Sequence, residues 1–357
     1  MNGDRLARLR AALLELKLDG MLVSHGPNRR YMTGFAGSAG YALVSAEEAL
    51  LLTDFRYAAQ AAAQAACFQV AQHAVRPYET LAEHVRRLGI RRLGVEGRHL
   101  TLSAASLLQE AIGAGTECVP ANDVVEKLRN VKDAGEIRTL ERAAAIAEDA
   151  LAHVLGYIRP GVTERRIAAE LEYRMRLLGA DAGWSPLIVA SGERSALPHG
   201  IASDKEIAYG EFVTLDFGAI VDGYMSDVTR TVFVGRPSDR HREVYAAVLE
   251  ANLAAIGGLG PGMTGKEGDS LGRDVIESRG YGEYFGHGLG HGIGLEIHEH
   301  LRLSRESESV LEPGNVLTVE PGIYIPGFGG VRIEDDVLVT ETGIRVLTSS
   351  SKELLVL

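Results

Sequence analysis

Cysteine is scarce in this sequence, since the 357 residues include only Cys67 and Cys118. Two isolated cysteines cannot form the disulfide framework of a small secreted protein, and they do not form a C-x-x-C redox or metal motif. We therefore expect two buried, apolar thiols in a protein of the reducing cytoplasm.

Long apolar runs and an excess of positive charge are also missing. No stretch of about 18 apolar residues occurs, which excludes a membrane-spanning helix. The first 19 residues carry charges and lack the apolar core of a signal peptide. The formal net charge is −11, so the phosphate backbone of a nucleic acid would be repelled. These absences indicate a protein without membrane or nucleic-acid partners.

The length and the pattern of the chain predict two domains. In residues 1–122, short apolar runs of strand length alternate with helical patterns, which predicts an α/β domain. The expected strands are 20–24, 41–45, 49–53, 68–71, 93–95 and 117–119, and the expected helices are 4–18, 55–66, 78–88 and 101–112. Residues 123–357 form the second domain, which begins with helices at 134–158 and 164–178. From residue 185 onward the pattern is one of strands and tight turns.

The dipeptide Asp222-Gly223 predicts a two-residue hairpin turn, because both residues tolerate positive φ. The segments on either side alternate as strands do, at residues 211–218 and 224–234. In that register Asp216 faces Thr229, and Asp227 lies two residues further along the same face. Two carboxylates this close repel each other unless a proton or a cation lies between them. Each aspartate taken alone could equally be an independent surface residue.

A second motif places histidines among alternating glycines, in the segment from Gly286 to Glu299. Glycine at alternate positions disfavours a helix. In an extended chain His287 and His291 share one face, and the glycines on the other face let a neighbouring backbone approach closely. With His298, the segment has three histidines within twelve residues. This density indicates a site that binds a ligand, since packing alone does not explain it well.

Glu320 and Glu334 each end a strand-like run and are expected to point inward. A buried glutamate is costly unless it is paired, and Arg332 is a candidate partner. The combined set has four carboxylates and one imidazole, which suits Mn²⁺, with Co²⁺, Fe²⁺ or Zn²⁺ as alternatives. Such a set exceeds what one ion needs and predicts two divalent ions roughly 4 Å apart. The expected metal ligands are Asp216, Asp227, His291, Glu320 and Glu334.

These residues, in this order, resemble the pita-bread metallopeptidases, the family of methionine aminopeptidase, aminopeptidase P and prolidase. The resemblance covers roughly residues 125–357 and implies an α+β pita-bread domain. It implies that Asp216 chelates one ion, that Asp227 and Glu334 bridge, that His291 binds the other ion, and that Glu320 also ligates. The segment Pro198-His199-Gly200 matches a further family motif.

The family resemblance also implies roles in catalysis. A hydroxide bridging the metals would attack the scissile carbonyl, with Glu320 as general base and acid. His298 and His199 would contact the substrate carbonyl or the tetrahedral intermediate. His287 would line the site for proline, and Arg332 is assigned to the same substrate-binding side.

The first 120 residues are similar to the creatinase-like domain of prolidase, aminopeptidase P and creatinase, which methionine aminopeptidase lacks. The segment from Asn28 to Gly40 resembles small bacterial aminopeptidases P, and related segments occur in prolidases. The resemblance therefore implies a proline-specific peptidase, acting on small proline-containing peptides and forming a homodimer.

Three functions remain open. The first expectation is an Xaa-Pro aminopeptidase acting on peptides of three or more residues, because a dipeptide would bring its carboxylate beside four others without a dedicated cation. The alternative is an Xaa-Pro dipeptidase, which needs an arginine or lysine near the proline end. A more remote alternative is an inactive peptide-binding module on the same fold, against which the intact ligand set argues.

Overall fold

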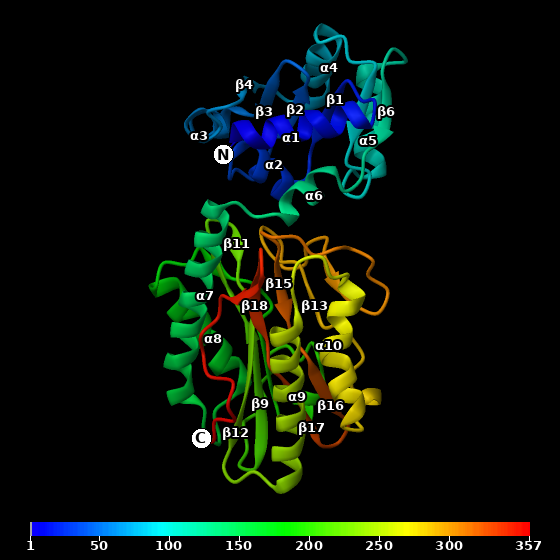
Figure 1. Cartoon of the computed structure of the whole chain (residues 1–357). Coiled ribbons are helices and arrows are strands. Elements are labelled where there is room, and N and C mark those ends of the chain that lie inside the picture. Colours follow the sequence, from blue (N-terminus) through cyan, green and yellow to red (C-terminus); the bar gives the residue numbers. More distant parts are fainter. Residues whose placement is uncertain (1) are drawn as a thin grey trace. The chain divides into compact units, whose positions relative to one another are not determined.

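The computed structural model describes residues 2–357, and the chain divides into two compact units, one up to Arg129 and one from Asn130 onward (Figure 1). The sequence-based boundary between residues 122 and 123 falls just before helix α6 (Val124–Asn130). In the described part of the chain, no helix is long and apolar enough to cross a membrane.

Helix α6 is bonded to the first unit. The Tyr31 hydroxyl donates to the Leu128 carbonyl at 3.0 Å, and the Arg129 guanidinium donates to Oδ1 of Asn28 at 2.7 Å. These contacts explain why the first unit includes most of this helix.

The first unit is built on a six-stranded mixed sheet in the order β4-β3-β2-β1-β5-β6. The pairs β1–β2 and β2–β3 are antiparallel, whereas β3–β4, β1–β5 and β5–β6 are parallel. The strands are β1 (Gly20–Val23), β2 (Tyr41–Ser45), β3 (Ala49–Thr53), β4 (Gln69–Gln72), β5 (Arg92–Val95) and β6 (Glu117–Pro120). Each strand predicted for this region is present, within a residue or two of its expected bounds.

The helices of this unit are α1 (Asn2–Glu15), α2 (Gly26–Thr33), α3 (Ala58–Gln64), α4 (Pro77–Arg87), α5 (Leu102–Ile112) and α6. The sequence pattern assigned no helix to α2. Its bounds follow from Pro27 in the first turn and from Gly34, whose φ of 79° ends the helix. The expected burial of both cysteines is wrong for Cys67, which is exposed, while Cys118 is partly buried.

The second unit contains the remaining strands, arranged in small sheets. They are β7 (Ala182–Gly183), β8 (Ile188–Ser191), β9 (Glu211–Phe217), β10 (Ala219–Val221), β11 (Tyr224–Met225), β12 (Val228–Val234), β13 (Gly290–His291), β14 (Arg302–Leu303), β15 (Val316–Val319), β16 (Gly322–Ile325), β17 (Gly329–Arg332), β18 (Asp335–Thr340) and β19 (Gly343–Val346). The sheet orders are β12-β9-β8, β11-β10-β7, β15-β18-β19, β16-β17 and β13-β14.

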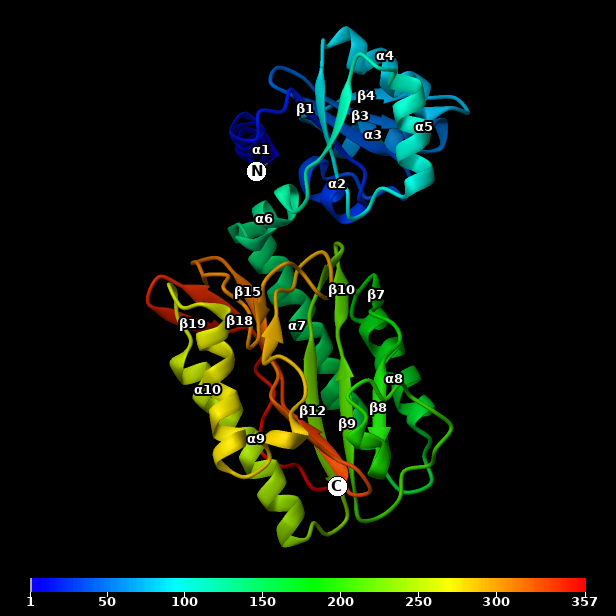
Figure 2. The ribbon, with the colours of Figure 1, turned by 90° about the vertical axis from the view of Figure 1, so that its right-hand side faces the viewer.

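Helices cover the strands of this unit from two sides (Figures 1 and 2). On one side lie α7 (Ala134–Val154) and α8 (Glu164–Leu177), and on the other α9 (Asp239–Gly258) and α10 (Gly265–Ser278). Each pair closes its own apolar core against the strands. The polar side chains of the central strands are therefore held between two packed layers.

The helices α9 and α10 differ from the sequence-based expectation of strands and turns after residue 185. Both helices begin with a capping box, at Ser238 and at Thr264. Glycines in α10 obscured the helical pattern, and Gly272 packs closely, since a Cβ there would lie 2.5 Å from Cδ1 of Leu289. Tertiary packing therefore outweighs the weak helix propensity of glycine.

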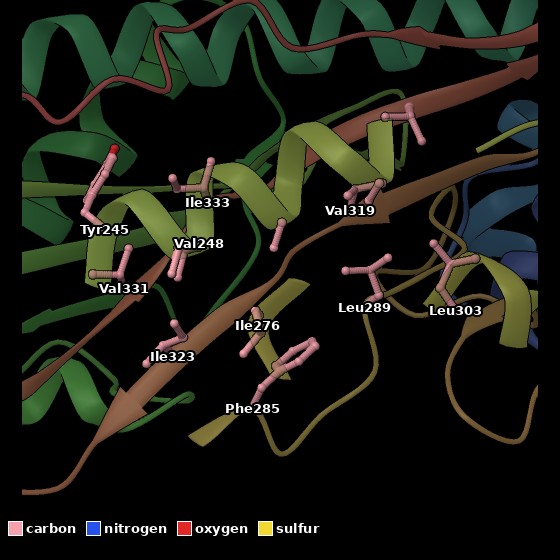
Figure 3. Close-up of a cluster of buried hydrophobic side chains, with 14 of the residues drawn as sticks. Tyr245, Val248, Ile276, Phe285, Leu289, Leu303, Val319, Ile323, Val331 and Ile333 are labelled. Carbon is pink, nitrogen blue, oxygen red and sulfur yellow. The ribbon is translucent and has the colours of Figure 1, made fainter. Parts of the chain in front are cut away.

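Apolar side chains of α9 fill the space against the C-terminal strands (Figure 3). Tyr245 and Val248 lie in one cluster with Ile323 and Val331, and the last three of these are fully buried. Burying a side chain of this size contributes about 1.5–3 kcal/mol. This core supports the strands that carry Glu320 and Glu334.

One ion pair is buried at the start of the second unit. The Lys132 ammonium donates to the Glu299 carboxylate at 2.9 Å, and the two side chains are 1% and 4% exposed. The same carboxylate accepts the backbone N–H of Leu295 at 3.0 Å. A Cβ at position 294 would lie 2.5 Å from Oε1 of Glu299, so a larger residue there would have to displace this carboxylate. The pair therefore holds the glycine-rich loop that carries the predicted site histidines.

We expect Lys132→Met to destabilise the second unit by about 3–5 kcal/mol, because Glu299 would be left buried without its cation. The measurement is urea unfolding followed by fluorescence of Trp184, the one tryptophan, which lies in this unit. Arg165→Met is the control, because the Arg165–Asp204 pair is exposed and its loss should matter far less. Equal midpoints for the two variants would contradict the prediction.

Candidate active site

The hairpin forms as predicted and brings two aspartates together. Asp222 and Gly223 have φ angles of 46° and 75°, and Val221 pairs with Tyr224. The same register pairs Asp216 of β9 with Thr229 of β12. Asp227 lies just before β12, and both aspartates are buried, at 8% and 5% exposed.

His291 enters the same space from β13. Its Nε2 lies 3.7 Å from Oδ2 of Asp227 and 3.3 Å from Oε1 of Glu320. Its Nδ1 lies 3.1 Å from the Gly292 carbonyl, which fits an Nδ1–H donor and leaves the Nε2 lone pair facing the carboxylates. A Cβ at position 290 would lie 1.9 Å from the Thr318 carbonyl, so only glycine allows this approach. Burial lowers the pKa of His291 to about 3, and the imidazole is therefore neutral.

Glu320 and Glu334 come from the ends of two C-terminal strands. Glu320 directly follows β15, and Glu334 lies between β17 and β18 with 1% exposure. The Thr229 hydroxyl donates to Oε2 of Glu334 at 2.5 Å, and the Thr318 hydroxyl donates to Oε1 of Glu320 at 3.2 Å. The structure thus brings together all the residues predicted to bind metal.

Two carboxylate oxygens in this cluster are buried without a hydrogen-bond partner, Oδ1 of Asp227 and Oε1 of Glu334. Burial raises the pKa of both carboxyl groups well above the usual range, and the neighbouring carboxylates raise it further. Donor atoms of Asp227, His291 and Glu334 all lie within 4.8 Å of one another. Orphaned acceptors in a crowd of like charges fit a bound cation, so these residues could hold a divalent metal.

Arg332 is the cation already present among these carboxylates. Its guanidinium forms an ion pair with Asp216 and donates to the Tyr324 hydroxyl at 2.8 Å and to the Pro198 carbonyl at 3.2 Å. The side chain is 4% exposed. The ion-pair partner of Arg332 is thus Asp216, whereas the sequence pointed to Glu320 or Glu334. The role of Arg332 as a substrate contact stays a prediction.

Of the three remaining predicted histidines, His199 and His298 are exposed and His287 is partly buried. The rings of His298 and His291 meet edge to face, 4.3 Å between centroids, and the His298 residue is exposed. Burial lowers the pKa of His287 to about 4, and Arg332 and His199 lower it further. Burial also lowers the pKa of His298, with Arg302 and His199 as further causes. The three rings therefore lie within electrostatic range of one another.

Sequence reasoning missed Tyr324, which links two parts of the site. Its hydroxyl lies 2.8 Å from Nε2 of His287 and accepts a hydrogen bond from Arg332. Burial raises the pKa of this phenol to about 12. Its position two residues after Gly322, on the apolar strand β16, suggested a core residue and contained no local signal of this role.

Sequence reasoning also missed Glu164, which tethers the segment that carries His199. This carboxylate is fully buried and accepts hydrogen bonds from Ser191 at 2.8 and 2.9 Å and from Ser203 at 3.1 and 2.6 Å. Arg194 completes the anchor. Directly after the N-cap Thr163, Glu164 looked like an ordinary first-turn residue. Its partners lie 27 or more positions away, so local patterns could not reveal them.

The metal-free protein should lose stability as the pH rises. Burial raises the pKa of Glu320 from 4.5 to about 7, so the folded state binds this proton more tightly than the unfolded chain. The resulting stabilisation, at most about 3 kcal/mol, is complete below pH 4.5 and is lost as the pH rises through about 7.

We expect the melting temperature of chelator-treated protein to fall over this interval, and Glu320→Gln to show a smaller fall because its side chain does not titrate. A divalent cation should reverse the loss above pH 7, since it binds only the deprotonated cluster. The same pH dependence in the variant and in the parent would contradict this origin.

Comparison with known proteins identifies the family of the chain. Metallopeptidase family M24 matches residues 138–341, and the creatinase/prolidase N-terminal domain matches residues 5–131. The structure of an Xaa-Pro dipeptidase from Bacillus anthracis has a TM-score of 0.98 and 52% identity, covering 100% of both chains. The X-Pro aminopeptidase from Thermotoga maritima has a TM-score of 0.92 and 40% identity, over 99% of this chain and 100% of that chain. An Xaa-Pro dipeptidase of Pyrococcus furiosus is 41% identical over 99% of each sequence.

These matches confirm the predicted fold class, a creatinase-like α/β domain followed by an α+β pita-bread domain. The chain therefore belongs to metallopeptidase family M24, with a creatinase/prolidase N-terminal domain.

Proposed function

We propose that this chain is a metal-dependent peptidase that hydrolyses the bond preceding proline, and that Xaa-Pro dipeptides are its preferred substrates. The observation that carries the first part is the buried carboxylate cluster, which contains orphaned acceptors and is bordered by three histidines. The relatives named Xaa-Pro dipeptidase, at 52% and 41% identity, support it.

We infer that the cluster holds two divalent ions, with Mn²⁺ as the native metal. Four carboxylates carry more negative charge than one divalent ion and Arg332 can neutralise. The ligands are mainly oxygen atoms, which Mn²⁺ prefers. Ions bound by Asp216, Asp227, His291, Glu320 and Glu334 would polarise the scissile carbonyl and lower the pKa of the attacking water.

We assign proton transfer, oxyanion stabilisation and proline binding to side chains in and around the cluster. Glu320 has a pKa near neutrality in the metal-free protein, which suits a group that takes and returns a proton. His298 and His199 are exposed, and an imidazole N–H there can donate to the oxyanion. The His287 ring packs 5.0 Å from Phe285 and 5.5 Å from Tyr324, and we assign this largely apolar wall to the proline ring.

The dipeptide preference rests on Arg302, which sequence analysis did not select. Its guanidinium donates to the backbone carbonyls of Glu299 and Leu301, the latter at 2.9 Å. Burial lowers the pKa of Arg302, and the negative charge of Glu320 opposes that shift. Arg302 therefore supplies positive charge beside Glu320 and His298 while its hydrogen-bond partners are neutral carbonyls. An aminopeptidase is expected only where such a cation is missing from the site.

A dipeptide substrate carries its carboxylate directly on the proline, close to the reacting bond. Placing that charge near four carboxylates is unfavourable unless a cation receives it. A guanidinium can do so through two parallel hydrogen bonds. We therefore assign Arg302 to the substrate carboxylate.

An Xaa-Pro aminopeptidase is the second candidate, and the 40% identical enzyme named X-Pro aminopeptidase favours it. In that case the carboxylate of a longer peptide would lie further out, in water, and Arg302 would contribute little to its binding.

The two candidates differ in the substrate dependence of Arg302→Gln. For a dipeptidase, the parent should prefer Xaa-Pro over Xaa-Pro-Yaa, and the variant should lose about tenfold or more in kcat/KM for the dipeptide only. Arg305→Gln is the control, because Arg305 is exposed and paired with Glu277. A parent enzyme that cleaves the tripeptide about tenfold better would establish the aminopeptidase instead.

Glu320→Gln should lower kcat by about 10²–10⁴-fold, because an amide cannot accept the proton. The metal content of each preparation is measured at the same time, so that loss of metal is separated from loss of the base. The exposed Glu306→Gln serves as the matched control. Near-normal turnover in metal-loaded Glu320→Gln protein would remove Glu320 from this role.

A further inference from the structure

A second group of metal-type ligands lies in the first unit, in a cluster formed by His25, His99 and Glu126. One donor atom from each residue lies within 4.8 Å of the other two. His25 is the N-cap of α2, His99 follows β5, and Glu126 belongs to α6. Three separate elements therefore bring this cluster together, and none of its members belongs to the proposed active site.

One carboxylate oxygen of Glu126 is hydrogen-bonded, and the other is not. Its Oε1 accepts a hydrogen bond from the Asn28 amide at 2.7 Å and lies 3.3 Å from Nε2 of His99. Its Oε2 is buried without a hydrogen-bond partner. A buried carboxylate oxygen without a donor is costly, and a cation beside it would remove that cost.

A polar network anchors the Glu126 carboxylate through Asn28. The Asn28 amide also donates to Glu96 at 2.7 Å, and Oδ1 of Asn28 accepts from Arg129 at 2.7 Å. Glu96 in turn accepts the backbone N–H groups of Ser24 and His25, both at 2.6 Å. Such outer contacts are what orient ligands in metal sites.

The two imidazoles are stacked face to face, with centroids 3.6 Å apart and ring planes 9° from parallel. Their nitrogen lone pairs run side by side, so one ring must turn before both can point at a single ion. His99 can make this turn, because it lies on a loop and its side chain is 30% exposed. A rotation of the His99 ring would therefore let both imidazoles and the carboxylate face one ion.

We propose that His25, His99 and Glu126 bind one transition-metal ion of the Zn²⁺ type, separate from the catalytic metals. Two imidazoles and one carboxylate are a usual Zn²⁺ set that leaves a fourth position for water. The catalytic cluster is different in kind, since its carboxylates favour Mn²⁺. An ion in the first unit joins α6 to the loops before α2 and after β5, so it stabilises this unit and takes no part in hydrolysis.

The test counts Zn²⁺ in the full chain by equilibrium dialysis and elemental analysis. The parent carries Asp227→Asn and Glu334→Gln, which weaken the catalytic site and remove buried like charges. We expect this parent to bind one Zn²⁺ per chain more than the same protein with His99→Gln or Glu126→Gln. His73→Gln is the matched control, because His73 is a partly exposed histidine of the same unit outside the cluster, and this variant should retain the ion.

The same comparison is made in the chain without Asp227→Asn and Glu334→Gln. It tests the proposal even if the protein with those two substitutions folds poorly. There, too, His99→Gln should bind one Zn²⁺ fewer, while hydrolysis by the Mn²⁺-loaded enzyme stays unchanged. Equal Zn²⁺ content in the parent, His99→Gln and Glu126→Gln proteins would overturn the proposal. A loss caused equally by His73→Gln would overturn it as well, because the ion would then be bound nonspecifically by surface histidines.

Discussion

The arrangement on which the rest of the second unit depends is the burial of several carboxylates in one small space. The donor atoms of Asp227, His291 and Glu334 lie within 4.8 Å of one another. Two carboxylate charges 4.8 Å apart repel by roughly 3 kcal/mol even at an effective dielectric of about 20. Arg332 offsets part of this through Asp216. The remainder has to be met by protons or by cations, and this requirement links the stability of the unit to pH and to metal.

Two packed cores hold this arrangement in place. The α7 and α8 core supports the hairpin of Asp216 and Asp227, and the α9 and α10 core supports the strands that end at Glu320 and Glu334. His199 and His298 are exposed beside this cluster, where the substrate is expected. Buried polar anchors, Glu164 with its serines and Lys132 with Glu299, fix the loops that carry these histidines. The reactive groups therefore lie on strands and on tethered loops, which limits their motion.

Much of the site could be predicted from sequence because its signals are local. Asp222-Gly223 determines the hairpin turn, and the turn determines which residue faces Asp216. Alternating glycines around His291 indicated an extended chain with another backbone packed closely against it. The structure has such a contact between Gly290 and the Thr318 carbonyl. The helix α10 escaped prediction because its interior glycines lower the intrinsic helix propensity. The helix α9 has glycine only at its C-terminal end, so its sequence did contain a helix signal, which the expectation of strands and turns after residue 185 overlooked.

The sequence by itself therefore determined the fold family, the hairpin register and the set of candidate metal ligands, since each depends on residues near one another in the chain or on a specific order of motifs. Only the tertiary structure decided the contacts of Tyr324, Glu164 and Arg302, and the meeting of His25, His99 and Glu126. Their partners lie on other elements, and the pattern around each residue is typical of an ordinary helix, strand or loop. The tertiary packing that brings these elements together is thus what places these side chains beside one another.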